Sequence, residues 1–192
     1  FIDAPIINFT GLNMLRLFIG LALPDHVKDQ LAPMASGIPE APWIDQQNLH
    51  LTLRFIGEVD EDIVEDIHNA LSKLEFQGFT LQLNGVDCFR SGNKVRSVWA
   101  GIASSASLKA LRRRVEGILV NAGLPPETRK FKPHVTLARL KQAKVTSVIP
   151  YLEANAGFQT QQFQVEQLVL FQSHLGHRGA TYEALASYPE TL

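Results

Sequence analysis

Two tetrapeptides of one pattern, one in each half of the chain, constrain the fold most strongly. Residues 50–53 read His-Leu-Thr-Leu, and residues 134–137 read His-Val-Thr-Leu. Each lies in an alternating run that is typical of a β-strand, in which successive side chains point to opposite faces of the sheet. The histidine and threonine of each motif therefore share one face. The apolar residues share the other face, which the fold has to bury.

The remaining sequence supplies an alternation of strands and helices. Strand patterns occupy residues 15–23, 49–56, 79–89, 95–102, 134–140, 163–172 and 181–187, and helical patterns occupy residues 25–34, 60–74, 107–121 and 143–155. Each half carries a β-α-β-β type unit with one histidine-bearing strand. We therefore expect an α+β fold of two pseudo-symmetric lobes, with antiparallel sheets flanked by helices around a central cleft.

The strand pattern starts after Met14, so we divide the 192-residue chain there. Residues 1–13 are interpreted as an N-terminal extension, either an upstream segment or a remnant of cloning. Residues 14–192 are expected to form a single bilobal domain, since a chain of this length suits one compact domain or two lobes sharing a core.

Composition narrows the function classes. Hydrophobic residues make up 45% of the chain and charged residues 19%, as in soluble globular proteins. No run approaches the ~20 apolar residues of a membrane span, and the single cysteine, Cys88, excludes an internal disulfide. We therefore expect a cytoplasmic monomer that does not associate with membranes. The net charge of −1 argues against coating of long nucleic acid and favours recognition of a small part of one, such as an end.

Two imidazoles that face one cleft suit phosphodiester chemistry. One histidine can take a proton from water while the other gives a proton to the leaving oxygen, because histidine titrates near neutrality. Threonine hydroxyls can donate hydrogen bonds to the non-bridging phosphate oxygens. If a His-x-Thr motif occurred alone, the alternative to catalysis would be a histidine that forms a purely structural hydrogen bond. A zinc site is a further alternative, but neither motif has a second ligand at metal spacing, so we expect no metal and no cofactor.

The sequence resembles the 2H phosphoesterase superfamily. More narrowly, it is similar to the bacterial and archaeal RNA 2′,3′-cyclic phosphodiesterases, also called 2′-5′ RNA ligases. The resemblance runs from about Met14 nearly to the end, through residues 15–21, 48–59, 98–102, 131–139, 170–175 and 179–185. It implies metal-independent hydrolysis of an RNA 2′,3′-cyclic phosphate terminus to a 2′-phosphate. The expected partners are RNA ends of this kind or small cyclic nucleotides.

The resemblance also implies roles for particular residues. His50 matches the proton donor to the departing 3′-oxygen, and His134 matches the proton acceptor that activates water. Thr52, Thr136 and Arg139 match the groups that hold the phosphate. Strict alternation puts Arg139 on the face opposite His134, so it reaches the cleft only if the strand ends or bulges there. A solvated arginine is the alternative.

Two further residues are candidate RNA contacts. Arg54 shares the His50 face by alternation and can neutralise a phosphate, or it can form a salt bridge with a carboxylate at the rim. Phe131 can stack on a base or pack against the core. Ten Lys and Arg residues between positions 109 and 144 surround the second motif and can steer RNA, whereas residues 58–66 hold six acids at an expected helix start.

Two other functions use the same residues. The reverse reaction would join a cyclic phosphate to a 5′-hydroxyl and give a 2′-5′ linkage. A protein that binds RNA ends without turnover is the second alternative, although a pure binder needs no acid–base pair.

Overall fold

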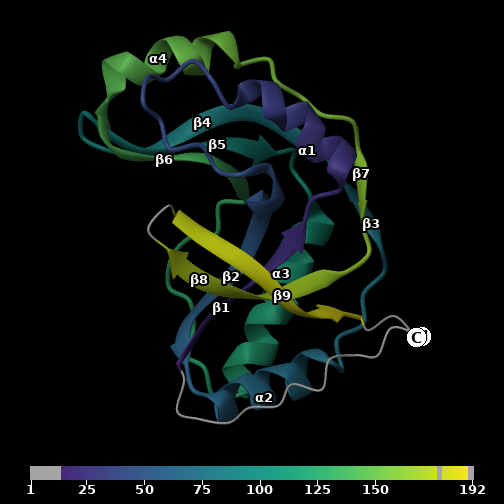
Figure 1. Ribbon diagram of the computed structural model, residues 1–192. Coiled ribbons are helices and arrows are strands. Elements are labelled where there is room, and N and C mark those ends of the chain that lie inside the picture. The colour runs from purple at the N-terminus through teal and green to yellow at the C-terminus, as the bar shows by residue number, and fades with distance from the viewer. Residues whose placement is uncertain (1–13, 177–178, 190–192) are drawn as a thin grey trace.

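The computed structural model describes residues 14–176 and 179–189 (Figure 1), so the predicted extension at residues 1–13 lies outside the described part. The strands are β1 (Leu15–Ala22), β2 (His50–Val59), β3 (Phe79–Leu81), β4 (Leu83–Ser91), β5 (Lys94–Ile102), β6 (His134–Lys144), β7 (Phe163–Val165), β8 (Leu168–Gly176) and β9 (Gly179–Tyr188). The helices are α1 (Asp25–Leu31), α2 (Glu61–Leu71), α3 (Ala106–Asn121) and α4 (Val145–Ala154). Within these residues, no helix is both long and apolar enough to cross a membrane.

Seven strands form one antiparallel sheet in the order β4-β5-β6-β2-β1-β8-β9. Strands β2 and β6 are joined at one register pair only, Leu51 with Val135, whereas the other neighbours share long ladders. This short joint divides the sheet into two parts. We call β2-β1-β8-β9 the His50 lobe and β4-β5-β6 the His134 lobe.

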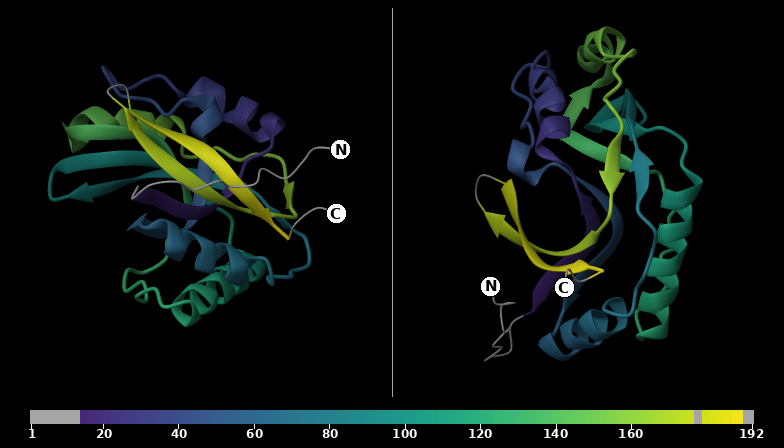
Figure 2. Two further views of the ribbon diagram at one scale, coloured as in Figure 1. Left: turned by 60° about the horizontal axis from the view of Figure 1, so that its bottom comes forward. Right: turned by 90° about the vertical axis from the view of Figure 1, so that its right-hand side faces the viewer.

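The two lobes are not the two halves of the sequence. The His50 lobe takes the first two and the last two strands of the large sheet, and the His134 lobe takes the middle three. Strands β3 and β7 pair with each other where the chain passes between the lobes (Figure 2). Helix α4 packs on β4, β5 and β6, whereas α2 packs against α3, and α3 packs on β2. The expected pair of similar lobes is present, but the lobes interleave along the chain.

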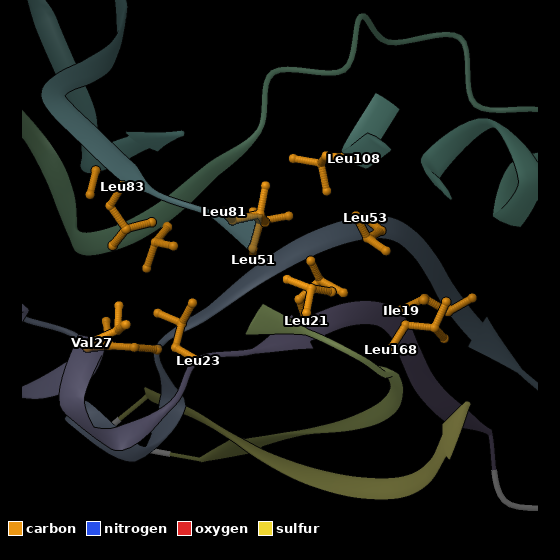
Figure 3. Close-up of a cluster of buried hydrophobic side chains, with 14 of the residues drawn as sticks. Ile19, Leu21, Leu23, Val27, Leu51, Leu53, Leu81, Leu83, Leu108 and Leu168 are labelled. Atoms are coloured by element: carbon orange, nitrogen blue, oxygen red, sulfur yellow. The ribbon is translucent and has the colours of Figure 1, made fainter. Parts of the chain in front are cut away.

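The apolar face of the motif strands builds the core. Leu51 and Leu53 of β2 lie with Ile19 and Leu21 of β1 in one buried cluster (Figure 3). Val135 and Leu137 of β6 belong to the same cluster, which continues through both lobes. Truncating a buried leucine to alanine costs about 2–5 kcal/mol, so this packing fixes the strands that carry the histidines.

Most predicted elements are present, with boundaries that shift for local reasons. The side chain of Asp60 accepts a hydrogen bond from the Ile63 amide at 3.1 Å and caps α2. The pattern starting at residue 25 is confirmed for α1, in which Pro24 occupies the cap position and Asp25 is the first helical residue. Strand β2 was expected to end at Gly57, but that glycine adopts a φ of 94° and the strand continues to Val59.

Candidate active site

The two motifs meet at the joint between the lobes. Because β2 and β6 run antiparallel and pair at Leu51 and Val135, the residues on either side of that pair lie on the opposite face of the sheet. His50 is thereby placed next to Thr136, and His134 next to Thr52. Diagonal neighbours across such a pair have Cα atoms about 7–8 Å apart, which leaves room for one phosphate between the two histidines.

A bulge follows the motif in both strands. Ile19 and Gly20 of β1 pair with Arg54 and Thr52, so Leu53 is an extra residue in β2. In the same way, Val98 and Trp99 of β5 pair with Ala138 and Thr136, which makes Leu137 the extra residue in β6. The third and fourth residues after each histidine are consequently both buried, and alternation resumes one position later.

The bulge in β6 brings Arg139 to the cleft. Arg139 is exposed and lines the same cavity as both histidines, with an electrostatic effect on each of them. The loop before β2 supports this geometry, since the amide of Arg139 donates to the carbonyl of Pro42 at 3.2 Å and Trp43 bridges to Ala138. Strict alternation fails here because the bulge shifts the register by one residue.

The corresponding bulge in β2 changes the environment of Arg54. Phe55, not Arg54, takes the position equivalent to Arg139, so the predicted sharing of a face by Arg54 and His50 is wrong. The Arg54 side chain is buried, and its Nε donates to Glu116 Oε2 at 2.9 Å. Its Nη2 donates to the carbonyl of Pro125 at 2.6 Å, and its Nη1 to the carbonyl of Phe55. Arg54 still borders the cavity, but its guanidinium is held in the salt bridge named as the alternative.

Phe131 combines the two predicted roles, contact with the cleft and packing against the core. It is partly buried against the core and also lines the cavity. The guanidinium of Arg112 lies 5.7 Å from the centre of its ring, within cation–π range. One face of Phe131 is therefore already occupied by protein.

Backbone carbonyls fix the tautomer of both histidines. The Nδ1 atom of His50 lies 2.7 Å from the carbonyl of Asn48, and Nδ1 of His134 lies 2.7 Å from the carbonyl of Lys132. A carbonyl oxygen only accepts, so each Nδ1 carries a hydrogen and each Nε2 is the atom that exchanges a proton. The Nε2 of His50 lies 3.0 Å from the Thr52 hydroxyl, whereas no described residue hydrogen-bonds Nε2 of His134.

Both imidazoles are neutral in the free protein near pH 7. Burial is the main cause that lowers the pKa of His50, to about 4, and the positive charge of Arg139 adds to the effect. Burial also lowers the pKa of His134, with Arg139 and Lys132 as further causes. An anion bound between the histidines would act in the opposite direction and raise both pKa values.

Aromatic rings surround each histidine, and the sequence did not single them out. The His50 ring lies 4.7 Å from Phe18 and 4.8 Å from Tyr182, measured between ring centres. The His134 ring lies 4.9 Å from Phe89. Tyr182 falls within residues 179–185, one of the stretches that carried the resemblance, and was the available signal. Phe18 and Phe89 lie in strand patterns, where an aromatic residue indicates core packing.

The cavity between the lobes holds about 850 Å³. Cationic residues dominate its charged lining, with Asp45 and Glu127 as the acids; the cations are Arg16, Arg54, Arg129, Lys130, Lys132 and Arg139. Among residues 14–176 and 179–189, no three His, Cys, Asp or Glu side chains are grouped so as to hold a metal ion. The cavity lining supplies two imidazoles, the Thr52 hydroxyl and an excess of positive charge, which suits an anionic phosphoester.

Comparison with known proteins agrees with this geometry. The family model described as the 2′-5′ RNA ligase superfamily matches residues 23–177, which include both motifs and both bulges. The chain belongs to the 2′-5′ RNA ligase superfamily. A superfamily protein of Aeropyrum pernix named RNA 2′,3′-cyclic phosphodiesterase is 35% identical over 162 residues, which cover 83% of this chain and 90% of that protein. A protein of the same name from Methanocaldococcus jannaschii is 27% identical over 91% of this chain and 100% of its own length.

Solved structures share the fold of this chain. The crystal structure of E. coli LigT complexed with 3′-AMP has a TM-score of 0.78 to this chain at 26% identity, covering 94% of this chain and 100% of LigT. The PDE domain of MHV ns2 has a TM-score of 0.53 at 13% identity and shows the likeness of fold alone. The bilobal α+β architecture is therefore that of the LigT-like phosphoesterases.

Proposed function

We propose that this protein hydrolyses the 2′,3′-cyclic phosphate at the 3′ end of an RNA and leaves a 2′-phosphate. The observation that carries the proposal is the placement of two His-Thr pairs on one face around the Leu51–Val135 joint. Each imidazole has its Nδ1 tied to a carbonyl, so its Nε2 is committed to the cleft chemistry. The names of the relatives, RNA 2′,3′-cyclic phosphodiesterase, support the choice of substrate.

In this mechanism His134 acts as the base. Its Nε2 has no hydrogen-bond partner among the described residues and can accept a proton from a water molecule. The oxygen of that water bonds to phosphorus while the bond from phosphorus to the 3′-oxygen breaks in line. The proton from water ends on His134, and the 2′-oxygen keeps the phosphate.

His50 acts as the acid. Its protonated Nε2 gives a proton to the departing 3′-oxygen, and the ribose regains its 3′-hydroxyl. The Thr52 hydroxyl at 3.0 Å from that nitrogen is placed to donate to a non-bridging phosphate oxygen, as is Thr136 by the pseudo-symmetry. Arg139 is placed to balance the charge that accumulates on these oxygens.

The substrate itself provides the protonated state of His50. Burial disfavours the charged imidazolium, so His50 is neutral in the free protein. The negative charge of a bound phosphate favours the imidazolium and raises the pKa of His50. His50 and His134 together then hold one proton near neutral pH, which is what one acid and one base require. A reducing compartment such as the cytoplasm suits a chain whose single cysteine, Cys88, is a free thiol.

A turnover assay with 2′,3′-cyclic AMP tests this function. The product is identified by ³¹P NMR, and the control is the His134→Ala variant, which lacks the base and whose folding is checked by circular dichroism. We expect 2′-AMP as the product from the wild-type protein alone. Absence of turnover would leave an RNA-end binder, and formation of 3′-AMP would show that the wrong ester bond had been assigned. Adding an RNA with a free 5′-hydroxyl tests for ligation in the same experiment.

A further inference from the structure

The outer end of the His134 lobe carries only positive charge. Five exposed cations lie on the hairpin of β4 and β5 and on the end of β6; they are Arg90, Lys94, Arg96, Lys141 and Lys144. We call these five residues the cationic strip. No Asp or Glu occurs between residues 88 and 115 or between residues 128 and 152. This surface therefore differs sharply from the whole chain, whose net charge is −1.

The cationic strip continues from the active site. Arg139, at the cleft, pairs with Ser97, and farther along the same two strands Lys94 pairs with Lys144. Helix α4 covers one face of these strands (Figure 1). Val95 and Leu140 of these strands are buried. Lys94 and Lys144 lie on the other face, because Lys94 is the strand neighbour of the buried Val95. Arg90 pairs with Val95 and therefore lies on the α4 side, at the edge strand β4. The five residue-to-residue steps from Arg139 to Lys144 span at most about 17 Å at the usual rise of a strand. An anion bound in the cleft is thus close enough to reach Lys94 and Lys144.

The charges of the strip are not neutralised within the described part of the protein. Other cations near the cleft form ion pairs, as Arg54 does with Glu116 and Lys132 with Asp87. None of the five strip residues forms an ion pair with a described carboxylate, and Lys94 donates to the neutral amide of Gln142 at 2.9 Å. Like charges directly opposite across a sheet destabilise it, so the pairing of Lys94 with Lys144 works against folding.

The His50 lobe provides an internal comparison. It has the same motif and the same bulge, but the corresponding end of its strands is acidic. There Arg16 pairs with Glu58, and Asp60, Glu61 and Asp62 follow at the start of α2. The two lobes therefore have similar backbones but opposite charges at these strand ends. A polyanion that leaves the cleft is attracted along the His134 lobe and repelled by the other.

We propose that the cationic strip binds backbone phosphates of single-stranded RNA upstream of the reacting terminus. This inference rests on the proposed function and defines its substrate class as a polynucleotide end, with a cyclic mononucleotide as a poorer substrate. The contacts are to phosphates, so they give affinity without base preference. Release of counterions from the RNA provides the free energy.

The test compares kcat/KM for a single-stranded RNA decamer with a 2′,3′-cyclic end and for 2′,3′-cyclic AMP. The variants are Lys94→Gln with Lys144→Gln, and Arg96→Gln with Lys141→Gln. The first pair relieves a like-charge contact, so it is not expected to impair folding. The matched control is Arg113→Gln with Arg114→Gln, which removes the same charge from exposed positions of α3.

For single strands, log K changes by about 0.7 per phosphate contact and decade of salt, so each lost contact costs about fivefold at 0.1 M salt. We expect the ratio of decamer to mononucleotide kcat/KM to fall about 25-fold in each strip variant, with a shallower salt dependence for the decamer. The control should keep the wild-type ratio. An unchanged ratio in both strip variants, or an equal loss in the control, would overturn the proposal.

Fluorescence anisotropy separates this inference from the proposed function. A labelled decamer with a 3′-phosphate requires no turnover, and its binding reports on the strip even if the protein hydrolyses neither substrate. Weaker binding in the strip variants than in the control supports the proposal. Equal binding by all variants, with or without catalytic activity, refutes it.

Discussion

Replacing Arg54 by methionine tests whether this residue anchors the active site or contacts substrate. Arg54 is 8% exposed and is hydrogen-bonded to Glu116 and to the carbonyls of Phe55 and Pro125. Breaking a buried ion pair costs about 3–5 kcal/mol. Glu116 keeps two partners, the Arg112 guanidinium at 3.2 Å and the Glu127 amide at 2.7 Å. The lower end of that range, about 3 kcal/mol, is therefore expected.

Urea unfolding measures this loss. With an m value of about 2 kcal/mol per molar, a loss of about 3 kcal/mol lowers the midpoint by about 1.5 M. Arg113→Met, at an exposed position of α3, is the matched control and should change stability by less than about 0.5 kcal/mol. A small midpoint shift in Arg54→Met, together with a weaker salt dependence of kcat/KM, would instead identify Arg54 as a phosphate contact.

Four further predictions concern the cleft. In Gly20→Ala the new Cβ would lie 2.8 Å from the Leu51 carbonyl oxygen. Thermal melts should therefore show a stability loss of about 1–3 kcal/mol, and turnover assays a lower activity. The control Gly117→Ala, whose new Cβ has nothing within 4 Å, should change neither. Burial lowers the folded-state pKa of His50 to about 4, so between pH 4 and 6.5 the unfolded chain binds more protons than the folded protein. The free energy of unfolding should therefore decline as the pH falls from 6.5 to 4. Melts that show no such decline, or an equal decline in His50→Gln, would contradict this. Treatment with EDTA should leave activity unchanged, and restoration of a lost activity by a divalent ion would refute side-chain acid–base catalysis. A nitrophenyl phosphodiester, whose leaving group needs little protonation, should partly rescue His50→Ala and leave His134→Ala impaired; the reverse pattern would exchange the acid and the base.

The sequence predicted the parts of the site that depend on strand periodicity. The common face of His50 and Thr52 follows from the period of two, and so does the burial of Leu51 and Leu53. The position of Arg139 did not follow, because one extra residue in a bulge reverses the alternation beyond it. Neither bulge is marked by glycine or proline; the extra residues are leucines that the core buries.

Local sequence patterns also could not predict which distant strands pair with each other. The lobes interleave because β8 pairs with β1, which lies far away in the sequence, and β9 then pairs with β8. Similarly, Phe18 and Phe89 lie in strand patterns, where an aromatic residue indicates core packing. Only the fold shows that their rings contact His50 and His134.

The rate of cyclic phosphate hydrolysis in histidine variants tests the central claim, that His50 and His134 act on one phosphate as a pair. We would measure kcat/KM for 2′,3′-cyclic AMP in His50→Ala, His134→Ala and the double variant, with circular dichroism to confirm folding. Each single replacement should cost about 10²–10⁴ in rate, and the double variant should lose less than the product of the two, because the histidines function as a unit. A single variant that keeps more than about a tenth of the wild-type rate, or losses that multiply in the double variant, would contradict a shared phosphate.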